Sequence, residues 1–170
     1  TPLAGIMMGT RCGDIDASML SYLAGKTGKT LEELTNDLNK KSGLLGVSEV
    51  SSDSRDVENA ANDGDTKAIL AQEMYARKIA NYIAMYNNLL GGADVITLTA
   101  GVGENSKTMR KSILDKIASL GVKIDEERND FRGEFRLIST DDSKIPVYVV
   151  PTDEELMIAM DTVELKNKNK

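Results

Sequence analysis

Residues 91–106 read GGADVITLTAGVGENS, and this stretch decides the fold of the chain. Its β-branched, apolar run Val95–Leu98 predicts a short strand, and Gly101 and Gly103 lie in the loop predicted to follow it. A helical pattern begins directly afterwards, near Ser106. Many α/β proteins hold a nucleotide with this order of elements, because glycine lets a ligand approach the backbone and a helix N-terminus offers unpaired N–H groups. Gly-x-Gly also serves as a plain tight turn, so both interpretations stay open at this point.

The composition narrows the class of protein. The chain has 170 residues, 41% of them hydrophobic, which is enough for one globular domain with a core. The formal net charge of −6 disfavours binding to nucleic acid. The single cysteine, Cys12, cannot form an internal disulfide and favours a cytoplasmic location. No apolar run approaches the length of a membrane span, so no membrane partner is expected. The absence of histidine excludes a histidine base or metal ligand from these residues.

The predicted elements alternate between helices and a few strands. Helical patterns cover residues 14–24, 31–41, 66–90, 106–120 and 152–165, with a brief helix after Asp53, and strands are predicted at 95–98, 135–139 and 146–150. Residues 1–13 and 42–56 are predicted loops. Asp14 and the pairs Thr30/Glu33 and Thr152/Glu155 are the predicted N-terminal caps. The order predicts a helix-rich α/β fold with a thin, incomplete sheet.

The longest predicted helix carries one continuous apolar face. The face repeats at helical spacing through Tyr75, Ile79, Tyr82, Ile83, Tyr86 and Leu90. Such a face predicts burial in the core. Its length also suits a second copy of the chain, so a homodimer contact is the alternative.

Two segments combine an arginine with nearby acids. Arg11, in a glycine-flanked loop, suits bidentate binding of a phosphate or carboxylate, although an ion pair with Asp14 is the simpler interpretation. In residues 51–56, Asp53 could contact a sugar hydroxyl and Arg55 could lie against an aromatic base. The simpler interpretation of that segment is a capping aspartate followed by an exposed arginine.

A third segment places acids after the last predicted strand. Asp153, Glu154 and Glu155 occupy the first turn of the final helix. Compensation of the helix dipole explains them without a ligand. Alternatively, one carboxylate reaches a water bound to Mg²⁺ at the carboxyl end of the strand, where open α/β sheets place their ligands.

Five motifs occur in a single order along the chain. They are MMGTRCGDID (7–16), GLLGVS (43–48), SDSRD (52–56), TAGVGENS (99–106) and PTDEELMIA (151–159). In this order the chain resembles the C-terminal portion of the acetate kinases, a family that includes propionate kinases, and the resemblance extends from end to end. That family belongs to the superfamily of acetate and sugar kinases, heat-shock ATPases and actin, whose two ribonuclease-H-like domains hold a nucleotide between them.

The resemblance implies a reaction and its residues. Acetate kinases transfer the γ-phosphoryl group of ATP to acetate, reversibly and with Mg²⁺, giving acetyl phosphate and ADP. Arg11 would be the catalytic arginine, and Glu154 would be the acid near the metal. Asp53, Ser54 and Arg55 would bind the nucleotide, as would Gly101, Val102, Gly103 and Asn105 in the wall of the adenosine pocket.

The resemblance also implies that further chain is needed for catalysis. A complete acetate kinase has a first half with its own phosphate loops, a catalytic histidine and a metal-binding aspartate, and none of these is found here. We therefore expect residues 1–170 to be the adenosine-binding and dimer-forming part of a two-domain kinase, inactive when isolated. A kinase for propionate or another short-chain acid remains an alternative, as does an inactive module that binds nucleotide or only dimerises.

Overall fold

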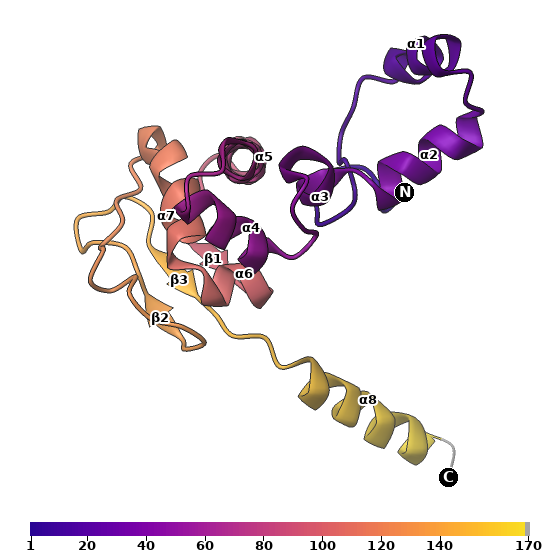
Figure 1. The fold of residues 1–170 in the computed structure, drawn as a ribbon. Coiled ribbons are helices and arrows are strands. Elements are labelled where there is room, and N and C mark those ends of the chain that lie inside the picture. Colours follow the sequence, from indigo (N-terminus) through magenta and orange to yellow (C-terminus); the bar gives the residue numbers. More distant parts are fainter. Residues whose placement is uncertain (169–170) are drawn as a thin grey trace.

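Three short strands form one mixed sheet in the computed structural model, which describes residues 1–168 (Figure 1). The strands are β1 (Ile96–Leu98), β2 (Arg136–Leu137) and β3 (Val147–Val149), in the order β1-β3-β2. β3 is central: it runs parallel to β1, with Ile96 opposite Val147, and antiparallel to β2. All three strands lie inside the predicted segments, and the thin sheet confirms the predicted helix-rich α/β class.

The helices precede, separate and follow these strands. They are α1 (Ser18–Thr27), α2 (Leu31–Lys40), α3 (Gly43–Ser48), α4 (Ser54–Asn62), α5 (Thr66–Leu89), α6 (Ala100–Asn105), α7 (Lys107–Lys116) and α8 (Glu154–Lys168), with a 3₁₀ turn at Ala118–Leu120. Figure 1 shows α1 and α2 at one end of the molecule, and α8 extending away from the sheet on a stretch of extended chain. Among the helices of residues 1–168, none is both long and apolar enough to cross a bilayer.

The apolar core divides into a cluster on the sheet, a cluster beneath α5, and a third in which Ala76 of α5 packs with Met109 and Ile113 of α7. The first contains Val147 and Val149 of β3 together with Leu114 of α7. The second packs α3 and α4 against α5 through residues such as Leu44 and Val57.

The buried side of α5 differs from the prediction. The fully buried residues of α5 are alanines, such as Ala68, Ala71 and Ala76, because α3, α4 and α7 approach closely and leave room only for small side chains. The tyrosine and isoleucine face is therefore only partly covered, and Tyr86 remains 55% exposed.

Two predicted caps are absent because their residues bind elsewhere. Asp14 does not cap α1: its carboxylate accepts hydrogen bonds from the Gly5 N–H at 2.7 Å and the Tyr82 hydroxyl at 2.7 Å. At α8 the cap is Asp153, which accepts from the Leu156 N–H at 2.9 Å, instead of Thr152. The predicted box at Thr30 and Glu33 is present in full.

Two predicted loops contain short helices. Residues 42–56 include α3, and the glycine loop of residues 99–105 forms α6 directly after β1. Both helices are only six residues long and contain two glycines each, so their sequences carry a weak helical signal. The second helix matters for function, because it turns the glycine loop into one wall of a groove.

Candidate functional site

A groove of about 760 Å³ lies between α4 and α6. It brings together residues far apart in the chain, including five of those predicted to bind a nucleotide, namely Ser54, Arg55, Gly101, Val102 and Asn105. The remaining lining residues are Glu58, Asn59, Asn62, Ser106 and Arg132. This volume suits a small organic ligand of nucleoside size.

The wall formed by α6 depends on glycine at two positions. A Cβ added to Gly101 would meet no other atom within 4 Å, so this position leaves space open on the groove side. A Cβ added to Gly103 would come within 3.1 Å of the Leu98 carbonyl carbon, so this glycine lets α6 pack tightly on β1. Ala100, the first residue of α6, lies directly before Gly101 and has a φ of 60°, a conformation that is strained for a residue other than glycine. The turn from β1 into α6 is therefore unusually sharp.

Asp53 and Arg55 form a pair at the N-terminus of α4. Asp53 caps the helix by accepting a hydrogen bond from the Arg55 N–H at 2.9 Å, and its carboxylate also accepts from the Arg55 guanidinium. These bonds lower the pKa of the Asp53 carboxyl to about 2. The capping interpretation is thus confirmed for Asp53, which flanks the groove without lining it. Arg55 lines the groove with a side chain that is 85% exposed.

The groove continues into a narrow, largely apolar crevice. Its lining includes Val57, Tyr75, Val102 and Met109, and it shares Ser54 and Glu58 with the groove. The crevice itself is too small for a ring, with a volume of about 10 Å³, so a ligand of nucleoside size fits only in the groove beside it.

Glu58 joins the two walls of the groove. Its carboxylate accepts hydrogen bonds from the hydroxyl groups of Ser106 and Thr108, the first at 2.9 Å, and so ties α4 to the start of α7. Ser106 in turn caps α7 by accepting from the Met109 N–H at 3.1 Å.

The sequence carried a signal for three lining residues that were not predicted. Glu58, Asn59 and Asn62 follow the predicted Arg55 at helical spacing and form one polar face of α4 with it. Arg132 lies in a loop and belongs to no such pattern.

A buried arginine braces the α6 wall from behind. Arg110 is fully buried, and its guanidinium donates hydrogen bonds to the carbonyl oxygens of Gly103 and Glu104, both at 3.0 Å. It also donates to the carbonyl oxygens of Asn129 at 2.7 Å and Phe131 at 3.1 Å, and to the Asn129 side chain at 2.6 Å. Arg110 thereby connects α6, α7 and the loop at 129–131.

The carboxylate of Glu104 connects α6 to the segment after β3. It accepts hydrogen bonds from the N–H and the hydroxyl of Thr152, both at 2.9 Å. The backbone N–H of Thr152 is the main cause that lowers the pKa of Glu104 below its usual value. This contact brings the end of β3, and the acids that follow it, to the α6 side of the molecule.

Arg11 lies apart from the groove. Its guanidinium donates to the Pro2 carbonyl at 3.4 Å and approaches the Met8 sulfur at 3.8 Å. It lines a separate open pocket together with Lys40 and other residues of α2. The loop that carries it is fixed by α3, since the N–H groups of Leu44 and Leu45 donate to the carbonyls of Met8 and Gly9, both at 2.9 Å.

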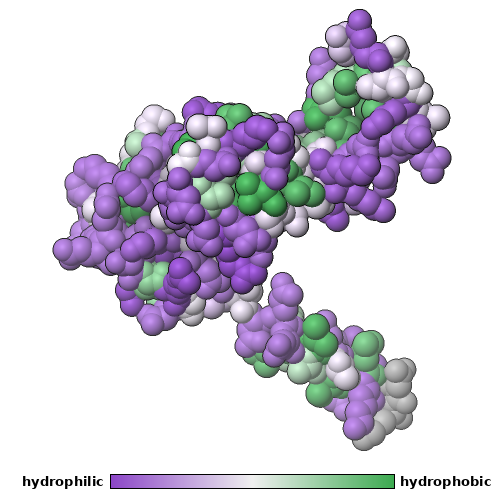
Figure 2. Space-filling view, viewed as in Figure 1, coloured by the Kyte–Doolittle hydropathy of each residue, from purple (hydrophilic) through white to green (hydrophobic). Residues whose placement is uncertain are grey.

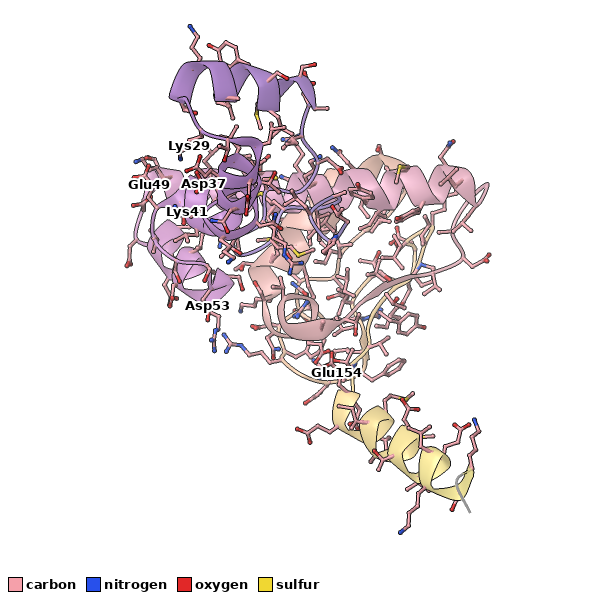
Figure 3. The ribbon with its side chains drawn as sticks, turned by 90° about the vertical axis from the view of Figure 1, so that its right-hand side faces the viewer. Lys29, Asp37, Lys41, Glu49, Asp53 and Glu154 are labelled. Atoms are coloured by element: carbon pink, nitrogen blue, oxygen red, sulfur yellow. The ribbon has the colours of Figure 1, made fainter. Side chains whose placement is uncertain are left out.

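Glu154 also lies apart from Arg55. Figure 3 shows Asp53 at the tip of α4 and Glu154 at the start of α8, on separate parts of the molecule. Within residues 1–168, no three acidic, cysteine or histidine side chains gather as a metal site. A magnesium ion that accompanies a nucleotide commonly takes one or two carboxylates and completes its shell with phosphates and water. Glu154 is an exposed residue at the start of α8.

Comparison with known proteins identifies close relatives. The sequence model described as the acetokinase family matches residues 1–160. The acetate kinase of Clostridium novyi is 48% identical over 169 residues, which are 99% of this chain and 42% of the relative. That of Methanosarcina thermophila is 49% identical over 165 residues, which are 97% of this chain and 40% of the relative.

Solved structures agree with the sequence comparison. The acetate kinase of Porphyromonas gingivalis has a TM-score of 0.90 and 44% identity over 96% of this chain and 41% of its own. A propionate kinase from Francisella tularensis has a TM-score of 0.87 and 41% identity over 94% of this chain and 40% of its own. The chain thus spans about two fifths of the length of the curated relatives it matches.

Proposed function

The chain belongs to the acetokinase family, and from this premise we propose that it forms the adenosine-binding part of a kinase that transfers a phosphoryl group between ATP and acetate. The main support for this proposal is the groove, whose lining includes Ser54, Arg55, Gly101, Val102 and Asn105. These five residues belong to two separate sequence motifs, 52–56 and 99–106, and they line one ligand-sized groove.

Each part of the groove suits one part of adenosine. The base would lie in the groove against Val102, over the mouth of the narrow apolar crevice, and the Arg55 guanidinium would lie against it. Asp53 would contact the ribose with the carboxylate lone pairs that Arg55 leaves available. Gly101 would admit the nucleoside without a side chain in its way, and Gly103 would keep α6 close to the sheet.

The phosphates would extend out of the groove toward the rest of the enzyme. There Arg11 would stabilise the transferring phosphoryl group, because a cation offsets the charge on its oxygens. Glu154 would supply one oxygen ligand to Mg²⁺, and the ion would neutralise phosphate charge when bound. Neither residue lines the groove, so we propose that chain beyond these residues completes the catalytic centre.

Acetate and propionate remain alternative acyl substrates in this proposal. The relatives named above include both acetate kinases and a propionate kinase, at comparable identity. We favour acetate, because the matched curated relatives are named acetate kinases. We further propose a cytoplasmic location, since the one cysteine, Cys12, is a free thiol.

We also propose that the chain contributes to a homodimer. An open apolar groove of about 410 Å³ lies between the N-terminal loop and α5, lined by residues such as Ile6, Ile79, Tyr82 and Tyr86. Partly exposed apolar side chains continue along α5 to Leu89, which is 72% exposed. Such a surface is typical of a protein–protein contact.

Calorimetric titration with ADP tests the nucleotide proposal. We expect saturable binding to the chain, and a loss of affinity of about tenfold or more in Gly101→Val, because the added side chain would occupy the groove. Gly25→Val is the matched control, since Gly25 is also helical, distant from the groove and free of contacts within 4 Å of its Cβ position. Absence of binding at millimolar ADP would contradict the proposal and favour a module that only dimerises.

A further inference from the structure

Arg132 is a second arginine in the groove, besides Arg55. It lies in the loop between Phe131 and Gly133, and its side chain lines the same groove as Arg55 and Asn105. Arg55 is paired with Asp53. Among residues 1–168, by contrast, no carboxylate forms an ion pair with Arg132, so its guanidinium is available to a ligand.

The backbone on both sides of Arg132 is held in place. The Arg110 guanidinium donates to the carbonyl oxygen of Phe131 at 3.1 Å, and the Gly133 N–H donates to the carbonyl oxygen of Glu104 at 3.2 Å. Because Arg110 also holds the carbonyls of Gly103 and Glu104, the loop and α6 form one braced unit. Arg132 is therefore presented from the α6 wall of the groove, whereas Arg55 is presented from the α4 wall.

The floor of the groove indicates which part of a ligand lies between these walls. Val102 lines the groove, and a crevice too narrow for a ring continues behind it between apolar side chains such as Met109, so this part of the groove favours contact with an uncharged ring over phosphate groups. A guanidinium is planar and weakly hydrated, so it stacks well on the face of such a ring. The same loop provides an example, since the guanidinium carbons of Arg110 and Arg136 lie 4.8 and 4.4 Å from the centre of the Phe131 ring.

We propose that Arg132 lies against the nucleobase on the side opposite Arg55, so that two guanidinium groups enclose the base. This inference rests on the proposed nucleotide function and adds a residue to it. It makes Arg132 a binding residue for the base and leaves the phosphates to other groups. Stacking of this kind predicts a loss of affinity of about five- to tenfold when the guanidinium is removed.

The test is titration calorimetry of the chain and of Arg132→Ala with ADP, adenosine and tripolyphosphate. We expect Arg132→Ala to weaken ADP and adenosine by the same factor and to leave tripolyphosphate binding unchanged. Arg132→Lys keeps the positive charge but removes the planar guanidinium, so we expect it to lower the affinity for both ADP and adenosine as well. Arg77→Ala is the control, because Arg77 is an exposed arginine on α5 that pairs with Glu73 away from the groove.

Three results would overturn the inference. Unchanged affinity for adenosine in Arg132→Ala would do so, as would a loss confined to ADP and tripolyphosphate, or full rescue by lysine. Thermal unfolding of each variant checks that an affinity change is not a loss of fold. If the unmodified chain bound neither ADP nor adenosine, the proposed function would fail and this inference with it, whereas equal binding by the chain and by Arg132→Ala would reject only the inference.

Discussion

Asp53 caps α4 and pairs with Arg55, and the ionisation of its carboxyl determines whether this pair forms. The Arg55 guanidinium and N–H lower its pKa from 3.8 to about 2. A carboxyl whose pKa is depressed by folding adds stability above its unfolded value and loses that contribution as pH falls through the folded one. We therefore expect the stability that the Asp53–Arg55 pair contributes to be complete above a pH of about 3.8 and to decline as the pH falls toward about 2, where half of the folded molecules have lost the pair.

Carbon-13 NMR of the Asp53 carboxyl measures this directly. The titration midpoint should lie near 2 in the unmodified chain and should rise toward 3.8 in Arg55→Gln, which removes the guanidinium but keeps the backbone N–H. Arg77→Gln, on α5, should leave the midpoint unchanged. A midpoint near 3.8 in the unmodified chain would show that the pair does not form.

The sequence predicted site residues best at positions where the local backbone favours one residue type, such as glycine in a tight turn or aspartate at a helix cap. Asp53, before Arg55, indicated a helix cap, and the structure confirms it. Gly101, next to a short strand, indicated a close approach of the backbone to a ligand; this stays a prediction, and the structure shows open space at that position of the groove. Arg132 gave no such signal, because its position depends on hydrogen bonds from Arg110 and Gly133 that only the fold creates.

Arg110 is the contact that joins elements around the groove. All the N–H groups of its guanidinium donate to α6 or to the loop at 129–131, and burial lowers its pKa below the usual value. Arg110→Met would leave these acceptors buried and unpaired. We expect it to lower the free energy of unfolding by about 3 kcal/mol or more.

Urea denaturation of Arg110→Met, with Lys111→Met as the matched control, checks this expectation. Lys111 is the next residue of α7, and its ion pairs with Asp115 and Glu126 lie at the surface, so its replacement should cost less than about 1 kcal/mol. Equal midpoints for the two variants would contradict a bracing role for Arg110. Arg110→Lys should also be destabilised, because an ammonium cannot reach both sets of acceptors.

The sequence did not predict the helices that are stabilised mainly by contacts with residues far away in the chain. α3 has six residues, and the N–H groups at its start donate to carbonyls of the N-terminal loop, such as those of Met8 and Gly9. α6 likewise begins at the strained Ala100 and depends on Arg110 at its end. By contrast, α5 and the Thr30–Glu33 box at α2 rest on local signals, namely long helical periodicity and capping, and both were predicted.

For the whole molecule, α8 contributes little to the packed body of the chain. It has no buried residue, and apolar side chains such as Leu156, Ile158 and Val163 are between 54% and 66% exposed. Figure 2 shows hydrophobic patches, in green, on the surface of this helix, which stands away from the rest of the molecule. The chain spans about two fifths of its relatives, so we infer that α8 packs on parts of the enzyme outside these residues.

Removal of residues 154–170 should therefore leave the cooperative unfolding of the remaining chain almost unchanged. We expect the midpoint of thermal unfolding to shift by less than about 2 °C, because a helix without buried apolar area adds little free energy to the folded state. Val147→Ala is the comparison, since Val147 is fully buried in β3 and its truncation should lower the midpoint by several degrees. Differential scanning calorimetry distinguishes the two changes. If the deletion lowered the midpoint as much as Val147→Ala does, α8 would be packed on the body of this chain, and the proposal that it packs on other parts of the enzyme would be wrong.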